Sequence, residues 1–443
     1  MPRARYQTLV DEFSHRIQSG ELRPGAQLPT VRALMQRQGV ALATAARVYR
    51  TLESAGLVVG EAGRGTFVRD TSLPRSHGPL AQQPGGGEGL VDLSFNYPAL
   101  PGQAELLREG LRGLAGSGDL DALLHAAPQG GRPHERASAA RHLRNRGIRV
   151  PADQVLIVNG AQQGLALAAL ALLRPGELLA VDALTYPGIR ALAAAHRLEL
   201  AALPLREGQT DLDALATLCR RRRVRAVYSM PTLHNPLGSV MGLAERQRLV
   251  ALAERHELLI IEDGAYAFLA EPAPPPLFIL APRRCIYVSG LSKSVASGLR
   301  IGFVAAPPAL VPALEQAQRA STWNTPSIAV ALACRWIEAG TVDALEDAKR
   351  RDARQRQRLA RRVLRGCRLS GHPGAYYLWL ELPAELRAEQ VVAELRQAGV
   401  LLSSAEPFAA TAHVPQALRV ALGSVPLDIL ELALGRVRAA LQP

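Results

Sequence analysis

Residues 289–303 read SGLSKSVASGLRIGF, and this stretch decides the fold of the larger part of the chain. It follows an apolar run at 286–288 that we expect to be a buried strand, and it places Lys293 in a loop of glycine and serine. Arg300 comes later in the same stretch, before a second apolar run. Of the 52 basic residues (Lys plus Arg) in the chain, only Lys293 and Lys349 are lysines. Because a lysine amine can lose its proton and attack a carbonyl, Lys293 is the first candidate for covalent chemistry.

Two more turns carry polar or small residues directly after apolar runs. Asp263 follows 258–262, where a buried carboxylate would be costly unless it met a cation. The turn 159–164 (NGAQQG) joins the run 155–158 to a helix, whose first backbone N–H groups can bind an anion. Since the carboxyl ends of parallel strands meet at one edge of a sheet, these groups would converge there with the lysine and the arginine. Together they fit pyridoxal phosphate (PLP), an anionic aromatic aldehyde.

From Val155 onward, strand and helix patterns alternate along the chain. The expected strands are 155–158, 178–181, 226–229, 258–262 and 285–288, and the expected helices include 161–173 and 243–254. Strands that alternate with helices predict an α/β fold with a mostly parallel sheet covered on both faces. From about Gly340 the pattern changes to a smaller α+β unit.

The first 69 residues predict a separate unit. Its expected elements are helices at 6–19, from 31 onward and at 41–54, followed by a short hairpin of 57–59 and 66–68. Thr30 is expected to cap the second helix, and Gly39 to turn the chain tightly into the third. This order predicts a winged helix-turn-helix, a fold that binds DNA.

Charge and cysteine usage narrow the possible partners and location. The net charge is +13, and residues 1–70 hold ten arginines and six acidic residues, so their net positive charge per residue is about twice that of the rest of the chain. The four cysteines are scattered without metal-ligand spacing, so we expect neither disulfides nor a metal. The sequence shows no signal peptide and no membrane span, since its longest apolar run is 165–173. We therefore expect a cytoplasmic protein.

The motifs of the chain resemble two known families. Residues from about Val91 to the end resemble fold type I aminotransferases, with NGAQQG, TYPG, HNPLG, EDGAY, SGLSKSVASGLRIGF and LRVALG in the family order. Residues 6–68 resemble the GntR family of DNA-binding domains, through GELRPGAQLPTVR, LESAGLV and GRGTFV. A fusion in this order resembles the MocR/GabR-type subfamily of GntR transcription regulators.

The resemblance implies a three-part organisation. It implies a winged helix-turn-helix domain at 1–69, a linker at 70–90, and an aminotransferase-like PLP-binding effector domain at 91–443. The linker is rich in Pro, Gly and Ser, which agrees with this division. The effector domain would have a large part at about 91–335 and a small C-terminal part at about 340–443.

The resemblance also implies a role for each candidate in the PLP site. Lys293 would condense with the PLP aldehyde, and Asp263 would pair with the pyridine nitrogen. The ring would be held by Tyr266, Asn235 and Tyr186, and the phosphate by Arg300, Ser292, Ala161 and Gln162. Arg419 lies where aminotransferases bind the α-carboxylate of the substrate, a task suited to its two-pronged side chain.

Plainer interpretations of these residues remain open. Asp263 could be a helix cap or the ion-pair partner of Arg300, and Tyr186 could be packing within a loop. Lys349 lies in EDAKRRDARQRQRLARR, and we expect it to be an ordinary solvated charge on a helix surface.

The sequence departs from the aminotransferase pattern in three places. Gly290 stands where a phosphate-binding serine is usual, and Leu184 where a proline is common. His125 replaces a tyrosine that commonly reaches the phosphate of the partner subunit. These departures put one phosphate contact and the contact between subunits in question.

The DNA-binding half departs from its family as well. GntR recognition helices commonly begin with Ser or Thr followed by Arg, and the matching pair is Ala41-Leu42. The candidate DNA contacts are Arg32, Thr44, Arg47, Arg50 and, in the wing, Arg64, Gly65 and Thr66. We expect sequence recognition to depend on the wing and on methyl contacts more than on bidentate arginine contacts.

Three functions compete on this evidence. The first is a homodimeric transcription regulator that binds double-stranded operator DNA in two half-sites and senses an amine, an amino acid or PLP itself. The second is an active aminotransferase with an appended DNA-binding domain, and the third is a PLP-binding scaffold without a sensing role. The sequence favours the regulator, because a DNA-binding domain is hard to explain on a metabolic enzyme. It leaves open whether a transaminase half-reaction remains.

Overall fold

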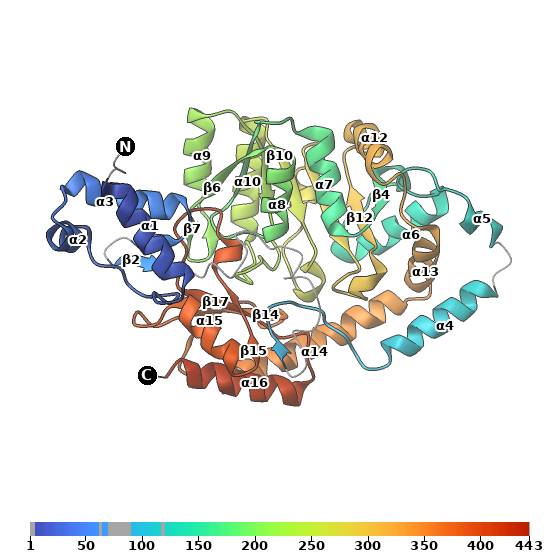
Figure 1. The fold of residues 1–443 in the computed structure, drawn as a ribbon. Coiled ribbons are helices and arrows are strands. Elements are labelled where there is room, and N and C mark those ends of the chain that lie inside the picture. Colours follow the sequence, from blue (N-terminus) through green and yellow to red (C-terminus); the bar gives the residue numbers. More distant parts are fainter. Residues whose placement is uncertain (1–4, 62–63, 70–89, 117–119, 443) are drawn as a thin grey trace.

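The computed structural model describes residues 5–61, 64–69, 90–116 and 120–442 (Figure 1). The expected linker at 70–90 therefore lies almost wholly outside the described residues. Within these ranges, no helix is both long enough and apolar enough to cross a membrane.

The N-terminal unit is a three-helix bundle followed by a hairpin. Its elements are α1 (Arg5–Gln18), α2 (Val31–Gln38), α3 (Leu42–Ser54), β1 (Val58–Glu61) and β2 (Gly65–Val68). The Thr30 hydroxyl accepts a hydrogen bond from the Ala33 amide at 3.1 Å and so caps α2. Gly39 turns the chain into α3 with φ of 59°, in the left-handed region that favours glycine. The predicted winged helix-turn-helix is confirmed.

A seven-stranded sheet forms the centre of the larger part. Its strands, in spatial order, are β4 (Val155–Val158), β12 (Gly302–Ala305), β11 (Cys285–Gly290), β10 (Leu259–Asp263), β9 (Val224–Ser229), β5 (Leu178–Asp182) and β6 (Glu199–Leu203). Strand β12 runs antiparallel to both of its neighbours, and every other pair is parallel. The strands carry almost continuous apolar residues, as strands covered on both faces do.

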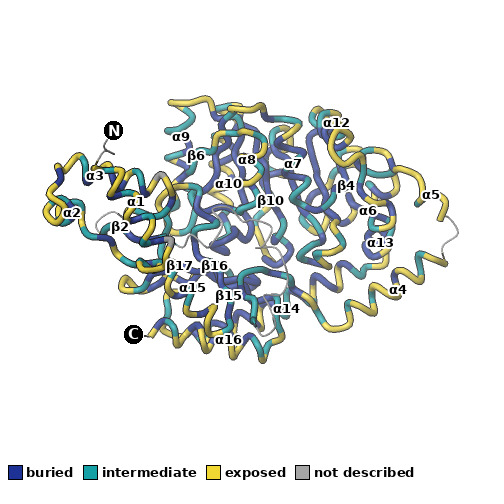
Figure 2. Tube along the Cα trace, viewed as in Figure 1, coloured by how far each residue is buried: buried dark blue, intermediate teal, exposed yellow. Residues whose placement is uncertain are grey.

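Helices cover both faces of this sheet, and the strands between them are buried (Figures 1 and 2). One face packs against α6 (Pro133–Leu143), α9 (Leu212–Arg221), α10 (Leu243–Arg255) and α13 (Ser327–Glu338). The other packs against α7 (Ala161–Leu172), α8 (Pro187–Ala195) and α12 (Val311–Ser321). The predicted α/β fold is therefore confirmed.

The long helix α14 (Thr341–Val363) leads from the large part to the small C-terminal part. The small part has an antiparallel sheet of β13 (Arg368–Ser370), β14 (Tyr377–Glu381), β17 (Ala417–Ala421) and β16 (Ser403–Ser404), packed against α15 (Ala388–Gln397) and α16 (Leu427–Ala440). Strand β3 (Val91–Asp92) pairs in parallel with β15 (Val400–Leu401). This pairing attaches the segment that follows β3 to the small part.

The winged helix lies against the small part (Figure 1). The Arg387 guanidinium lies 3.7 Å from the ring centroid of Phe67 in β2. Arg64 donates a hydrogen bond to the carbonyl of Ala384, and Arg69 pairs with the Glu406 carboxylate. These contacts join the tip and the base of the wing to the C-terminal part.

Candidate functional site

A pocket of about 570 Å³ lies beyond the carboxyl ends of β10 and β11. It is lined by all ten residues that the sequence predicts for the cofactor and effector: Lys293, Asp263, Tyr266, Asn235, Tyr186, Ala161, Gln162, Ser292, Arg300 and Arg419. They come from both parts of the chain, since Arg419 is in β17 of the small sheet. The pocket therefore lies between the large and the small part.

Lys293 lies in the loop after β11, and its amine points to the backbone of a distant segment. Its Nζ donates a hydrogen bond to the Asn96 carbonyl at 2.7 Å and lies 5.4 Å and 5.8 Å from the ring centroids of Tyr97 and Tyr266. Burial, and then the charges of Arg419 and Arg300, lower the pKa of Lys293 to about 8. At neutral pH, a larger fraction of Lys293 is therefore in the neutral, nucleophilic form than for a solvated lysine.

Asp263 ends β10 and is 2% exposed. Its Oδ1 accepts from the Ala265 amide at 2.9 Å, and its Oδ2 accepts from the Tyr228 hydroxyl at 2.8 Å. Burial raises its pKa, against these two hydrogen bonds, and no cation of the described chain contributes to the shift. Arg300 instead donates to the Asn159 carbonyl at 3.2 Å. A ring nitrogen that carries a proton would supply the missing positive charge.

The anion-binding end of the pocket is made by the start of α7 and by Arg300. The helix begins at Ala161 after Gly160, whose φ is 81°. A Cβ on Gly160 would lie 2.9 Å from a terminal nitrogen of Arg300, so the guanidinium packs directly on this turn. N–H groups and a guanidinium at one helix start suit a phosphate.

The structure explains why Gly290 replaces the usual serine. A Cβ at Gly290 would lie 2.8 Å from the Ile301 carbonyl oxygen and 3.4 Å from the Ala161 nitrogen. The backbones of β11, β12 and the α7 turn are so close that only glycine fits without a shift. Gly290 therefore brings no hydroxyl to this end of the pocket.

This packing yields a stability prediction for Gly302→Ala. The new Cβ would lie 2.5 Å from the Gly160 carbonyl carbon and 2.8 Å from the Ala161 nitrogen, so the start of α7 must move. We expect the free energy of unfolding, measured by urea denaturation, to fall by about 1–3 kcal/mol. Gly298→Ala is the matched control, because a Cβ there meets no heavy atom within 4 Å. Equal stability of the two variants would contradict this packing.

Arg419 is 5% exposed and points from β17 into the pocket. It donates to the Ser94 carbonyl and, at 3.4 Å, to the Asn235 side-chain oxygen. Its Nε is buried and has no hydrogen-bond partner among the described residues. Burial lowers the pKa of this guanidinium, and a carboxylate would both satisfy the free N–H and restore the charge balance.

The aromatic residues of the pocket differ in how firmly they are fixed. Tyr266 is buried and makes an edge contact with Tyr377, at 5.1 Å between ring centroids. Tyr186 is half-buried at the start of α8, where both it and Gly188 line the pocket. Gln162 donates to the Gly188 carbonyl at 3.1 Å, and its buried side-chain oxygen has no partner in the described part of the chain.

Among the pocket residues that sequence reasoning missed, two groups lie far from the motifs of the large sheet. The first is the segment Ser94, Phe95, Asn96 and Tyr97, and the second is Ser403 with Phe408 in the small part. Neither group follows a strand of the large sheet or carries a motif that indicates chemistry. Their positions depend on the pairing of β3 with β15, which joins segments about 300 residues apart and leaves no local signal.

The expectation for Lys349 was wrong. Its side chain is 0% exposed, although it lies in a helix rich in charged residues. The reason is that α14 passes beneath the loop of Lys293, so one face of this charged helix is buried between the two parts. Basic residues of α14 outside that face, such as Arg351 and Arg354, are exposed, as expected.

The other departures occupy ordinary positions. His125 is exposed at the C-terminal end of α5 (Asp121–Leu124), and its carbonyl accepts from Arg132 at 3.5 Å. Leu184 is 8% exposed and forms an isolated β-bridge with Ala409. Leu184, which stands in place of the proline, is therefore a buried packing residue.

The candidate DNA contacts fall into two groups. Arg32, Arg47 and Arg50 are exposed on α2 and α3, while Thr44 is half-buried. Leu42, at the apolar start of α3, is 54% exposed. An apolar side chain displayed there is consistent with contacts to thymine methyl groups.

The wing candidates are engaged within the chain in this structure. Arg64 donates to Ala384, and its own carbonyl accepts from Gln27 at 2.8 Å. Gly65 has φ of 121°, and Thr66 pairs with Gly60 in the hairpin. Arg64 would have to leave Ala384 in order to reach DNA.

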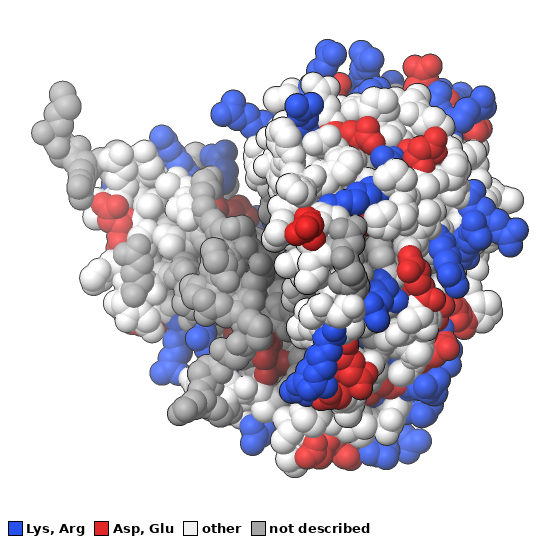
Figure 3. Space-filling view, turned by 90° about the vertical axis from the view of Figure 1, so that its right-hand side faces the viewer, with Lys and Arg blue, Asp and Glu red and all other residues white. Residues whose placement is uncertain are grey.

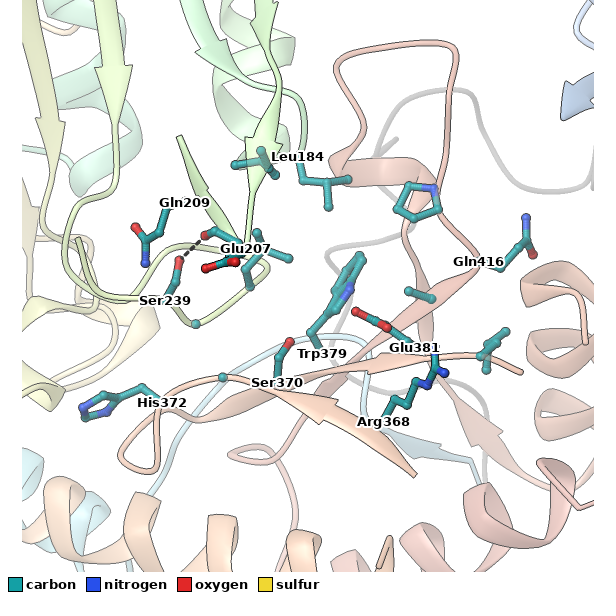
Figure 4. A pocket seen from close by; sticks show the side chains of 18 of the residues that line it. Leu184, Glu207, Gln209, Ser239, Arg368, Ser370, His372, Trp379, Glu381 and Gln416 are labelled. Carbon is teal, nitrogen blue, oxygen red and sulfur yellow. Dashed lines mark hydrogen bonds between the residues drawn. The ribbon is translucent and has the colours of Figure 1, made fainter. Parts of the chain in front are cut away.

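A second cavity of about 840 Å³ lies between the wing and both parts of the body (Figure 4). Arg64 contributes from the wing, Glu207 and Gln209 from the large part, and Trp379 and Glu381 from the small part. None of the predicted cofactor residues lines it, so we assign the chemistry to the smaller pocket.

The fold and the pocket define the class of protein: an aminotransferase-type α/β fold with a winged helix at its N-terminus. The chain belongs to the family described as "Aminotransferase class I and II", whose profile matches residues 90–437. The profile described as "Bacterial regulatory proteins, gntR family" matches residues 5–68. The predicted fusion of a GntR domain with an aminotransferase-like domain is therefore confirmed.

Known relatives include both regulators and enzymes. "Uncharacterized HTH-type transcriptional regulator YdeF" of Bacillus subtilis (strain 168) is 25% identical and covers 97% of this chain and 92% of its own length. "HTH-type transcriptional regulator TauR" of Rhodobacter capsulatus is 29% identical, over 88% of this chain and 87% of its own. The α-aminoadipate aminotransferase LysN of Thermus thermophilus, solved with N-(5'-phosphopyridoxyl)-L-leucine, is 26% identical with a TM-score of 0.72, over 80% of this chain and 92% of its own.

Proposed function

We propose that this protein is a PLP-dependent transcription regulator. Its aminotransferase-like domain senses an amine, an amino acid or PLP itself, and controls binding of operator DNA by the winged helix. PLP, when bound, supplies an aldehyde that reacts with amines and a ring that withdraws electrons. The chain's own residues bind, orient and select.

The residues of the pocket match PLP in their charges and in the chemical groups that they present. Lys293 is the amine for the aldehyde, and the buried Asp263 lacks a cation that a protonated ring nitrogen would provide. Tyr266 and Asn235 would hold the ring oxygen, and Tyr186 would lie against the ring. The phosphate would be held by Arg300, Ser292 and the backbone at Ala161 and Gln162. Arg419, with its unpartnered Nε, would select an effector that carries a carboxylate.

One observation carries the regulatory proposal: a single short turn touches both the pocket and the wing. Phe408 lines the pocket, with its ring centroid 5.2 Å from the Arg419 guanidinium. Glu406, in the same 3-10 turn (Glu406–Phe408), pairs with Arg69 at the base of the wing. Arg190 of α8 donates to the Pro407 carbonyl at 2.6 Å and so ties this turn to the large part.

An effector could therefore change operator binding through the small part. A ligand on Arg419 that moves the small part relative to the large part would move the wing, since Arg387 and Ala384 of the small part contact the wing. The second cavity lies mainly between the large and the small part, with Arg64 of the wing in its lining, and leaves room for such a movement (Figure 4). We expect a coupling free energy of about 1–3 kcal/mol. The direct test is operator binding by the full chain with and without PLP.

The second candidate is an active aminotransferase with an appended DNA-binding domain. It is favoured by the complete set of reactive residues in the pocket and by the likeness to "2-aminoadipate transaminase" of Thermus thermophilus, 28% identical over 86% of this chain. Sustained conversion of an amino acid and a keto acid would support it. A regulator would give at most a single half-reaction.

We also propose that the protein is a homodimer, which would bind an operator of two half-sites. The helices α4 (Gln103–Ala115), α5 and α13 form one end of the molecule (Figures 1 and 2), and large apolar residues in or next to them are exposed. They are Leu107, Leu111, Leu120, Leu124, Trp323 and Ile328. On the face seen in Figure 3, Lys and Arg side chains are interspersed with Asp and Glu among uncharged surface. Apolar patches of this kind mark protein interfaces.

This proposal gives a prediction for Leu124→Asp. Leu124 is 82% exposed, and a charge there would weaken a dimer by about 2 kcal/mol or more if Leu124 is buried on association. Sedimentation equilibrium measures the effect. Leu432→Asp, at a 66% exposed position on α16, is the control and should leave association unchanged. Equal behaviour of the two variants would place the interface elsewhere.

A further inference from the structure

The second lysine of the chain lies directly behind the first. Lys349 is fully buried, and its Nζ donates to three backbone carbonyls, those of Pro98 at 2.7 Å, Val295 at 2.8 Å and Lys293 at 3.1 Å. An ammonium group has three N–H donors, and each of them is used here. These three acceptors offset part of the cost of burying the charge.

The three carbonyls belong to the two segments that decide where the Lys293 amine lies. Lys293 and Val295 are part of the loop that follows β11. Pro98 lies two residues after Asn96, whose carbonyl accepts a hydrogen bond from the Lys293 amine at 2.7 Å. Gln103 adds a second donor to the Val295 carbonyl, at 2.8 Å. One buried amine therefore holds the backbone of Lys293 and the backbone of its hydrogen-bond partner at a fixed separation.

We propose that Lys349 is a positioning residue for Lys293, which holds the reactive amine in place for the cofactor aldehyde. The proposal rests on the PLP site of the proposed function and adds a role for a residue outside the pocket. Lys349 does not line the pocket, so it acts through the backbone of the loop.

The chemistry of the contact explains why this position is lysine in a chain whose basic residues, apart from Lys293, are otherwise all arginine. Three oxygens surround one nitrogen at 2.7–3.1 Å, a geometry that suits a compact point donor. A guanidinium is larger and presents its donors in a planar fork, so it would separate the carbonyls. Burial, and then the Lys293 charge, lower the pKa of Lys349 to about 7, while Asp352 acts in the opposite direction.

The test separates positioning of the amine from general integrity of the site. PLP can react with Lys293, whereas pyridoxamine 5'-phosphate binds the same contacts but has no aldehyde. For Lys349→Met we expect capture of PLP by Lys293, followed by absorbance and by peptide mapping after borohydride reduction, to slow by about tenfold to a hundredfold. The affinity for pyridoxamine 5'-phosphate should stay within about twofold of that of the unaltered protein. Lys349→Arg should capture PLP as slowly as Lys349→Met does, because the guanidinium cannot replace the amine between the three carbonyls.

Controls make each outcome decisive. Arg351→Met, at an exposed position two residues along the same helix, should capture PLP at the unaltered rate. Capture by Lys349→Met at that rate, or an equal loss of affinity for both cofactors, would overturn the positioning role. If Lys349→Met does not fold, Gln103→Leu removes the other donor to Val295 and should slow capture by about threefold, and an unchanged rate would again overturn the role. Failure of the unaltered protein to capture PLP at all would instead refute the proposed function.

Discussion

Lys293→Ala is expected to give a colourless protein whose affinity for PLP is at least about a hundredfold lower, equivalent to about 2.7 kcal/mol. The variant keeps the proposed phosphate contacts at the start of α7 but lacks the amine that we propose condenses with the aldehyde. We expect its operator binding to lose any response to PLP and to amines. The measurements are absorbance of the purified protein, PLP titration, and operator binding with and without ligand.

Lys293→Arg serves as the matched control for charge. It keeps a cation near the Asn96 carbonyl but cannot attack an aldehyde, so it should be as colourless as the alanine variant. If both variants kept the ligand response of the unaltered protein, covalent PLP chemistry would have no part in the mechanism. A ligand response in the arginine variant alone would mean that charge, and not nucleophilicity, matters at this position.

Separating the wing from the small part should give the second large effect. We expect the double variant Arg387→Ala/Glu406→Gln to bind operator DNA but to lose the influence of the ligand, so that an expected coupling factor of about 5- to 150-fold falls toward one. Arg387 lies 3.7 Å from the Phe67 ring centroid, a cation–π contact worth about 0.5–2 kcal/mol, and Glu406 pairs with Arg69. Operator affinity is measured with and without ligand.

Arg396→Ala is the control for this pair of substitutions. Arg396 is exposed near the C-terminal end of α15, the helix that Arg387 precedes, and its loss should leave coupling intact. PLP affinity should be unchanged in the double variant, because neither altered side chain lines the pocket. Full coupling in the double variant would show that the signal reaches the DNA-binding domain by another route.

The pocket residues could be predicted from the sequence where chemistry follows a strand of the large sheet. Asp263 ends β10, and Lys293 lies in the loop that follows β11, so a prediction of parallel strands is enough to bring them together. Asn96 and Phe408 could not be found in this way. They belong to irregular segments whose place depends on contacts between the ends of the chain, and no periodic pattern encodes such contacts.

Lys349 shows a second limit of sequence reasoning. A charged, amphipathic helix is expected to turn its basic residues to water. Four basic residues of α14 are exposed as this rule predicts, namely Arg351, Arg354, Arg358 and Arg362, whereas Lys349 and Arg356 are buried. The burial of Lys349 depends on which loop lies above the helix, and only the tertiary structure defines that. Its rarity in an arginine-rich chain was the one available signal, and it indicated special chemistry without indicating which kind.

The central claim is that ligand chemistry at Lys293 controls DNA binding by the winged helix. The most direct test is an operator-binding titration of the full chain, with a DNA fragment that the protein has selected from a random-sequence pool. It is carried out without PLP, with PLP, and with PLP plus a series of amines and amino acids. The account predicts that the dissociation constant for the operator changes by about 5- to 150-fold between at least two of these conditions. An identical dissociation constant under all of them would contradict it.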